Sequence, residues 1–205
     1  MSQQIWIPGA CSVAITCQDG VVLGNENRNT WGNMVTSKSM KKVFSLTPTI
    51  GLTASGLIGD FQTLVRIMRA QANLYKLEAG APISTRAMAK LVANFLYQRK
   101  LRPLFVNTTI AGVDPDGPKL YTLDAIGSLM QDDIGVSGSS TELSIGILEA
   151  EWRKDMTVEE GKKLIEKAVR VSLGRDVLSG DGIDILTITS AGSEEIHVNL
   201  DEPSA

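Results

Sequence analysis

Short β-strands alternate twice with pairs of helices along this chain, and that order constrains the fold more than any other feature. Residues 12–24 alternate around Asp19-Gly20, a dipeptide that accepts positive φ and favours a tight hairpin. Three further strands are predicted at 34–37, 43–46 and 50–55. This first run of strands is therefore expected to contribute to at least one antiparallel sheet.

Two helices are expected after these strands. Apolar residues recur at helical spacing from Leu57 to Leu77, with Phe61 and Tyr75 among them, which predicts one long helix. A second helix is predicted after Pro82, with Ser84 at its N-cap, because a serine there can accept from a free backbone N–H.

The second half of the chain repeats the alternation. Strands are predicted at 104–113 and 119–124, joined by the turn sequence Asp-Pro-Asp-Gly-Pro, and a third hairpin is expected around 127–137. A helix is predicted over 140–150, and another from Thr157, which forms a capping-box pattern with Glu160, to about Arg175. Two strands, at 183–190 and 195–200, close the chain.

Runs of antiparallel strands separated by helix pairs indicate an α+β fold. Two stacked antiparallel sheets between two helix layers, a four-layer αββα sandwich, would bury the apolar face of every predicted element. A length of 205 residues with 43% hydrophobic residues suits one domain with a sizeable core.

Composition excludes several classes of function. The net charge of −3, without a basic stripe, argues against nucleic acid as a partner. No apolar run reaches the length of a membrane span, and the first residues lack the pattern of a signal peptide. Cys11 and Cys17 are too few and too close for a disulfide framework. We therefore expect a cytoplasmic protein without a membrane anchor.

The chain has a single histidine, His197, which alternation places on the exposed face of the last strand. Zinc sites and histidine-based triads consequently have little support, and no glycine-rich loop has the spacing of a phosphate cradle. We expect neither a metal nor a cofactor. An enzyme built on this chain must use serine, threonine, cysteine, lysine or carboxylate side chains.

Several motifs carry a resemblance to a known family. They are Cys17-Gln-Asp-Gly-Val-Val-Leu-Gly-Asn-Glu-Asn-Arg with Ser37-Lys-Ser-Met-Lys-Lys-Val, then Thr53-Ala-Ser-Gly-Leu-Ile-Gly-Asp, Leu120-Tyr-Thr-Leu-Asp-Ala-Ile-Gly-Ser, Val136-Ser-Gly-Ser, and Arg175-Asp-Val-Leu-Ser-Gly-Asp-Gly-Ile-Asp. In this order, spread over nearly the whole chain, they resemble the β subunits of the 20S proteasome, most closely the archaeal ones. The resemblance implies the sandwich of the N-terminal nucleophile hydrolases, which agrees with the predicted element order.

The resemblance also implies a threonine protease, whose N-terminal threonine attacks the peptide carbonyl while its own freed amine helps to move the proton. The nucleophile position falls on Ala10, preceded by Gly9 at the processing site. The family's other catalytic groups match the lysine–acid pair Lys42 and Glu26, the polar residues Ser139, Asp176 and Ser179, and the oxyanion N–H of Gly56. Taken alone, Ser139 could instead cap the helix that follows it.

Ala10 has no hydroxyl, so neither self-cleavage nor peptide hydrolysis can proceed there. Residues 1–9 are then expected to remain as an uncut propeptide before a single domain at 10–205. Cys11 is a poor substitute, because neighbouring side chains on a strand point to opposite faces. A further departure is Ser140, where the family usually has glycine.

Substrate-binding positions also follow from the resemblance. Asn29, Met40, Ala54 and Ile58 match the positions that line the family's specificity pocket, and they suggest cleavage after hydrophobic residues in an active form. Thr30 and Ser55, with Gly56, match positions that pair with an extended substrate backbone.

Three functions remain open at this point. The first is a proteasome β subunit in which Ala10 is an engineered nucleophile knockout. The second is a naturally inactive β subunit that shapes the ring while a paralogue cleaves, and the third is a small-molecule amidohydrolase of the same fold. The resemblance implies α subunits and heptameric β rings (α7β7β7α7) as partners, unfolded polypeptides as substrates, and a regulatory ATPase as a further candidate partner.

Overall fold

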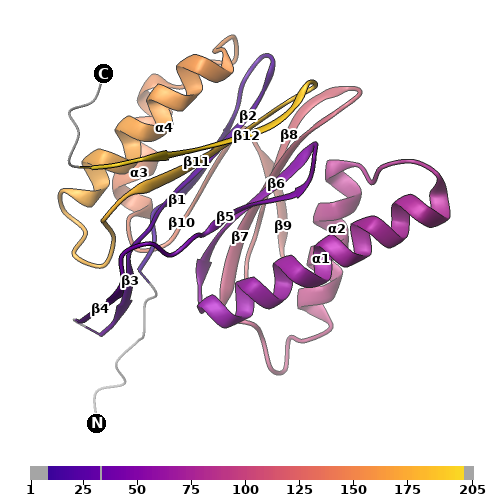
Figure 1. Ribbon diagram of the computed structural model, residues 1–205, viewed down its shortest axis with the longest axis horizontal. Helices are drawn as coiled ribbons and strands as arrows, with labels where there is room; N and C mark the ends of the chain where they lie inside the picture. Colours follow the sequence, from indigo (N-terminus) through magenta and orange to yellow (C-terminus); the bar gives the residue numbers. More distant parts are fainter. Residues whose placement is uncertain (1–8, 33, 201–205) are drawn as a thin grey trace.

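The computed structural model describes residues 9–32 and 34–200. Figure 1 shows two sheets stacked face to face, with one helix pair outside each sheet. The chain is therefore an α+β protein with the predicted four-layer αββα arrangement. Each sheet has five strands, and every strand pairing described is antiparallel.

The first sheet combines strands from both ends of the chain. Its strands, in spatial order, are β10 (Ile134–Ser137), β1 (Ser12–Thr16), β2 (Gly20–Glu26), β11 (Ile183–Thr189) and β12 (Gly192–Val198). The predicted hairpin at Asp19-Gly20 joins β1 to β2, with Thr16 opposite Val21. The carboxylate of Asp19 also accepts from the backbone N–H of Val158, so this turn is held against a helix.

The second sheet is formed by the middle of the chain. Its strands, in spatial order, are β5 (Val43–Thr47), β6 (Ile50–Gly56), β7 (Val106–Asp114), β8 (Gly117–Leu123) and β9 (Leu129–Asp132). A separate two-stranded sheet, β3 (Asn29–Trp31) with β4 (Met34–Ser37), projects from the body between the two larger sheets (Figure 1).

The helices cover the outer faces. The pair α1 (Ile58–Ala79) and α2 (Thr85–Tyr97) packs on the second sheet, and α3 (Thr141–Glu151) with α4 (Val158–Leu173) packs on the first. A third apolar cluster, which includes Ala14, Leu23, Leu120 and Leu186, lies between the two sheets. Three cores between four layers are what the predicted sandwich requires.

Local sequence signals account for three of the helix boundaries. The hydroxyl of Ser84 accepts from the N–H of Ala87, as predicted for an N-cap. Thr157 and Glu160 form the complete capping box at the start of α4. Gly80 ends α1 in the left-handed conformation at φ 68°, where its N–H bonds to the carbonyl of Lys76.

Several predictions about local structure were wrong or incomplete. The segment 127–137 is not a hairpin, because β9 pairs with β8 in the second sheet and β10 pairs with β1 in the first. Asp133, the one residue between β9 and β10, accepts from the N–H and hydroxyl of Thr16, so the chain passes from one sheet to the other there. The short strand β3 was not predicted, and Tyr75 of α1 is 42% exposed rather than buried.

The glycine of the first hairpin has a different purpose from the one predicted. Gly20 does not have a positive φ. A Cβ on Gly20 would lie 2.3 Å from the carbonyl oxygen of Ile188 on the neighbouring strand β11. The residue therefore permits close backbone approach rather than a left-handed turn.

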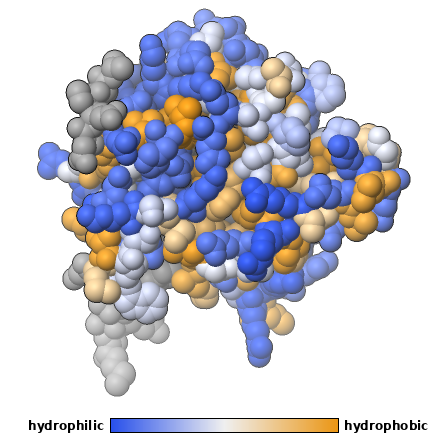
Figure 2. All heavy atoms as spheres, in the orientation of Figure 1, coloured by the Kyte–Doolittle hydropathy of each residue, from blue (hydrophilic) through white to orange (hydrophobic). Residues whose placement is uncertain are grey.

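The surface shown in Figure 2 is mainly hydrophilic, with apolar residues in separate patches. Within residues 9–32 and 34–200, no helix is both long enough and apolar enough to cross a membrane.

Candidate active site

Residue 10 lies two residues before β1, and its N–H and carbonyl both bond to the turn before α3. Ala10 is fully buried; its N–H donates to the hydroxyl of Ser139 at 3.2 Å, and its carbonyl accepts from the N–H of Ser140 at 3.3 Å. Gly138 adopts φ 105°, and a Cβ there would lie 2.2 Å from the carbonyl oxygen of Ala10. The turn before α3 can therefore approach residue 10 only because position 138 is glycine.

Three hydroxyl groups converge on one carboxylate oxygen of Asp176. The hydroxyls of Ser139, Ser140 and Ser179 donate to Oδ2 at 2.5, 2.5 and 2.7 Å, and the N–H of Leu178 donates to Oδ1 at 2.9 Å. Partial burial favours protonation of Asp176, but these four donors outweigh it and lower its pKa below the usual aspartate value. The carboxylate is thus stabilised as an anion, and Ser139 is oriented by it rather than capping α3.

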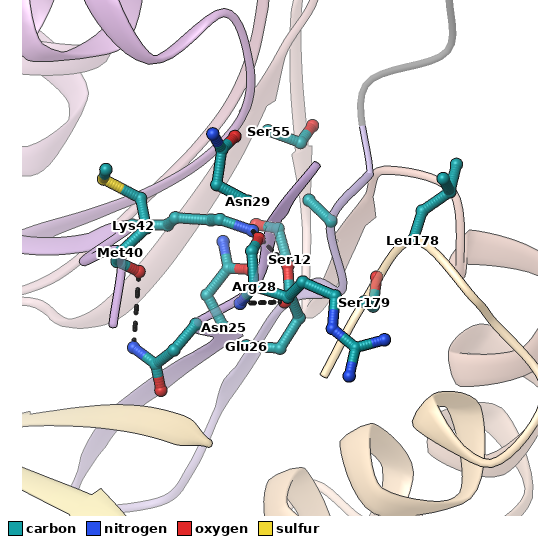
Figure 3. A network of polar contacts seen from close by, with 12 residues as sticks. Ser12, Asn25, Glu26, Arg28, Asn29, Met40, Lys42, Ser55, Leu178 and Ser179 are labelled. Carbon is teal, nitrogen blue, oxygen red and sulfur yellow. Dashed lines mark hydrogen bonds and ion pairs between the residues drawn. The ribbon is translucent and has the colours of Figure 1, made fainter. Parts of the chain in front are cut away.

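Lys42 and Glu26 form a buried ion pair. The ammonium of Lys42 contacts Oε1 of Glu26 and also donates to the carbonyl of Arg28 at 2.6 Å, and the Lys42 and Glu26 side chains are only 3% and 0% exposed. The other oxygen of Glu26 accepts from the N–H of Arg28 at 2.6 Å and of Gly180 at 3.0 Å. Figure 3 shows the Lys42 side chain extending to this carboxylate from the residue just before β5.

Burial dominates the protonation equilibrium of Glu26. Loss of solvent raises the pKa of Glu26, while the charge of Lys42 and the two backbone N–H donors oppose that rise. Both members are enclosed, so the pair is stable only while each has its partner.

The two groups of side chains are joined by one segment, residues 174–182, called here loop 174–182. It contributes Asp176 and Ser179 to the first group and the N–H of Gly180 to the second. Sequence reasoning therefore identified a set of residues that the fold brings together from β2, from the start of β5, from the turn before α3 and from loop 174–182.

Gly56 ends β6 in a conformation reserved for glycine. Its φ is 129°, and a Cβ there would lie 2.1 Å from the carbonyl oxygen of Phe105. Glycine is therefore required at this position by the backbone next to β7, and a substrate is not needed to explain it.

The predicted pocket residues divide into two sets. Asn29, Thr30 and Met40 are partly exposed on β3 and on the segment before Lys42, and Figure 3 shows Asn29 and Met40 beside Lys42. Ala54 is buried, and its N–H donates to the carbonyl of Lys42 at 3.1 Å.

The remaining predicted positions are Ser55, on β6, and Ile58, on α1. Ser55 is buried, and its hydroxyl donates a hydrogen bond to the hydroxyl of Ser137 at 3.0 Å. Ile58, the first residue of α1, packs with Ala54 in the apolar cluster beneath the helix pair.

Cys11 points away from this site. It belongs to the apolar cluster under α3 and α4, and its thiol lies 3.1 Å from the hydroxyl of Ser144. Burial raises the pKa of Cys11 to about 11, so the reactive thiolate is scarce at neutral pH. The Cys11 side chain is therefore enclosed under the helices, where its thiol is a poor substitute for the missing nucleophile.

Sequence reasoning missed the contributions of Ser140, Arg28 and Asp181. Ser140 appeared only as a departure from the family pattern, yet its hydroxyl binds Asp176. Arg28 and Asp181 form an ion pair at 2.8 Å beside the buried lysine. Both residues lie inside the motifs noted above, but 153 residues separate them, and nothing in either local pattern indicates that they meet.

The four-layer sandwich is the fold of the N-terminal nucleophile hydrolases. In this chain residue 10, two residues before β1, meets a Ser-Asp-Ser network that loop 174–182 joins to a buried lysine–glutamate pair. The particular family follows from comparison with known proteins. The sequence model of the family described as "Proteasome subunit" matches residues 8–188. The chain belongs to the proteasome β-subunit family.

Similar proteins come from several archaea. The chain is 40% identical to "Proteasome subunit beta 2" of Caldivirga maquilingensis over 98% of this chain and 100% of that protein. It is 40% identical to "Proteasome subunit beta 1" of Thermococcus onnurineus over 93% and 94%, and 37% identical to "Proteasome subunit beta" of Methanosarcina barkeri over 92% and 90%. The similarity thus spans nearly the full length of each protein.

Proposed function

We propose that this chain is a β subunit of a 20S proteasome core that lacks its nucleophile and therefore does not cleave peptides as written. The supporting observation is that residue 10, whose N–H donates to Ser139 and through it reaches Asp176, carries only a methyl group. A methyl group cannot attack a carbonyl, whereas a threonine hydroxyl could.

The surrounding residues suit threonine chemistry once a hydroxyl is present at residue 10. Lys42 would favour the alkoxide-like and free-amine forms by its charge, and Glu26 would hold the ammonium in place. Ser139, oriented by Asp176 and Ser179, would contact the freed amine, because it already accepts from the backbone nitrogen of residue 10. The N–H of Gly56 would stabilise the oxyanion.

Processing is expected to stop at the precursor. Residues 1–9 would remain attached, because the same nucleophile is needed to release them. Residues 1–8 lie outside the described part of the chain, so only Gly9 of this predicted propeptide can be placed. A Cβ on Gly9 would lie 2.6 Å from the carbonyl oxygen of Leu178, so glycine allows the chain to pass loop 174–182 there.

Partners and substrate class follow from family membership. We infer that the chain forms heptameric β rings stacked between α rings, and that the particle is cytoplasmic. Unfolded polypeptides are its inferred substrates, and a regulatory ATPase is a further inferred partner. The pocket positions Asn29, Met40, Ala54 and Ile58 carry no charge, which supports cleavage after hydrophobic residues in an active form. Thr30, Ser55 and Gly56 would pair with the substrate backbone.

The test is Ala10→Thr, assembled with α subunits and assayed on a reporter peptide with a hydrophobic residue before the scissile bond. We expect peptide hydrolysis and a mass loss corresponding to residues 1–9. Ala10→Ser, a weaker nucleophile of the same type, should give partial activity. Full assembly of Ala10→Thr without hydrolysis and with residues 1–9 retained would contradict the proposal.

One observation favours a second candidate, a naturally inactive subunit that supports the ring. The carboxylate of Asp176 accepts from four donors, one of them the hydroxyl of Ser140, so this carboxylate has its partners without a hydroxyl at residue 10. The genomic codon at position 10 separates the candidates. An alanine codon supports the structural subunit, and a threonine codon supports an engineered variant.

A further inference from the structure

We propose that Arg28 is a positioning residue, which holds loop 174–182 against the end of β2 and thereby aligns the Ser139–Asp176–Ser179 group with the Lys42–Glu26 pair. This inference rests on the proposed function, because it assumes that these two groups act together on residue 10. It assigns a role to a side chain that contacts neither residue 10 nor the predicted pocket.

The backbone of Arg28 is already part of the lysine–glutamate pair. Its N–H donates to Oε2 of Glu26 at 2.6 Å, and its carbonyl accepts from the ammonium of Lys42 at 2.6 Å. Any displacement of residue 28 would therefore change the surroundings of both charges.

The side chain of Arg28 binds the loop at three points. Its Nε and Nη2 donate to Oδ2 and Oδ1 of Asp181 at 2.8 and 3.3 Å, and its Nη1 donates to the carbonyl of Val177 at 3.2 Å. Such a paired guanidinium–carboxylate contact fixes direction as well as distance. Figure 3 shows the guanidinium directed at the loop segment that carries Leu178 and Ser179.

Gly180 fits this contact. A Cβ on Gly180 would lie 2.4 Å from Nη2 of Arg28, so the guanidinium occupies the space that a side chain would need. The N–H of the same glycine donates to Glu26. Arg28 thus holds the one residue of the loop that bonds directly to the buried glutamate.

Asp181 depends on Arg28 for its conformation. Among the described residues, Asp181 is the only one other than glycine with a positive φ, at 71°. This conformation costs free energy for a residue with a side chain. Its carboxylate is held by Arg28, and the hydrogen bond from Arg28 lowers the pKa of Asp181. Without this partner we expect the loop to relax, and Gly180, Ser179 and Asp176 to move with it.

The first experiment uses the Ala10 chain assembled with α subunits and measures hydrogen exchange of peptides covering loop 174–182. Arg28→Met keeps the aliphatic stem but removes the loop contacts, and we expect exchange in the loop to rise by about tenfold or more. Arg170→Met is the matched control, because Arg170 is similarly half-buried and binds Glu166 and two backbone carbonyls away from the site. Unchanged loop exchange in Arg28→Met would overturn the proposal.

The second experiment adds Arg28→Met to Ala10→Thr particles. We expect kcat to fall by about 10- to 100-fold while KM changes less than about twofold, because catalytic groups move and the pocket does not. Arg28→Lys, which keeps the charge but cannot form the paired contact, should recover part of the loss. An equal change in KM, or no change in kcat, would contradict a positioning role.

Asp181→Gly provides the decisive comparison, since glycine adopts φ 71° without cost. In that background the paired contact is already absent, and Arg28→Met removes only the bond to the Val177 carbonyl. It should therefore lower kcat less than about threefold. An equal loss in both backgrounds would overturn the proposal. If Ala10→Thr is itself inactive, the proposed function fails, but the exchange experiment still decides whether Arg28 holds loop 174–182. If Arg28→Met does not assemble, Arg28→Lys takes its place in the exchange experiment.

Discussion

The hydroxyl of Ser139 lies 2.5 Å from the carboxylate of Asp176 and 3.2 Å from the backbone nitrogen of Ala10. The serine therefore connects an ionised acid to the atom that would become the free amine of a processed chain. Because Ser140 and Ser179 bind the same carboxylate oxygen, the anion is held in place from three directions.

The stability of the chain should consequently depend on the charge of Asp176. The pKa of Asp176 is lowered in the folded state. Its contribution to the free energy of unfolding is therefore complete above the ordinary aspartate pKa of about 3.9, and it is lost as pH falls through the folded-state pKa. Thermal unfolding from pH 7 to pH 3 should show Asp176→Asn less stable at neutral pH, with the difference from the parent chain shrinking below about pH 4. Asp155→Asn, at an exposed position, should show no such convergence.

Removing one partner of the buried pair should cost far more than removing both charges. Lys42→Met leaves Glu26 enclosed without its cation, and we expect a loss of about 3–5 kcal/mol in the free energy of unfolding. Lys42→Met combined with Glu26→Gln should regain at least half of that loss in denaturant unfolding. Lys167→Met breaks an exposed ion pair with Glu151 and should cost less than about 1 kcal/mol.

The two cysteines should resist alkylation until the chain unfolds. Burial raises the pKa of Cys11 to about 11 and of Cys17 to about 12. At pH 8 the thiolate fraction of Cys11 is then about 100-fold lower than for a thiol of pKa 9, and burial also blocks the reagent. Mass spectrometry after iodoacetamide treatment should find both residues unmodified in the folded chain and modified in denaturant. Rapid modification of folded Cys11 would contradict its placement under α3 and α4.

Gly56 should not tolerate a side chain. Gly56→Ala must accommodate both φ 129° and a carbonyl oxygen 2.1 Å from the new Cβ, and we expect a loss of about 2 kcal/mol or more. Gly146→Ala is the matched control, because its new Cβ meets nothing within 4 Å and the residue lies inside α3. That variant should be neutral or more stable by up to about 1 kcal/mol, since alanine favours helices over glycine.

Local patterns in the sequence predicted the order of elements well, because strand alternation, helical spacing and caps are properties of neighbouring residues. The capping box at Thr157 and the N-cap at Ser84 have the predicted contacts. The segment 127–137 was misjudged for the opposite reason. β9 pairs with its sequence neighbour β8, but β10 pairs with β1, more than a hundred residues away, and local alternation does not record that pairing.

By itself, the sequence determined most of the element order, the candidate residues through their family motifs, and the missing hydroxyl at Ala10, because these depend on which residues are present and in what order. Only the tertiary structure decided how the candidates connect. Gly180 bonds to Glu26, Ser140 joins the Asp176 network, and Arg28 meets Asp181 across 153 residues. Such contacts form when separate elements pack together, and the local pattern around each residue does not record them.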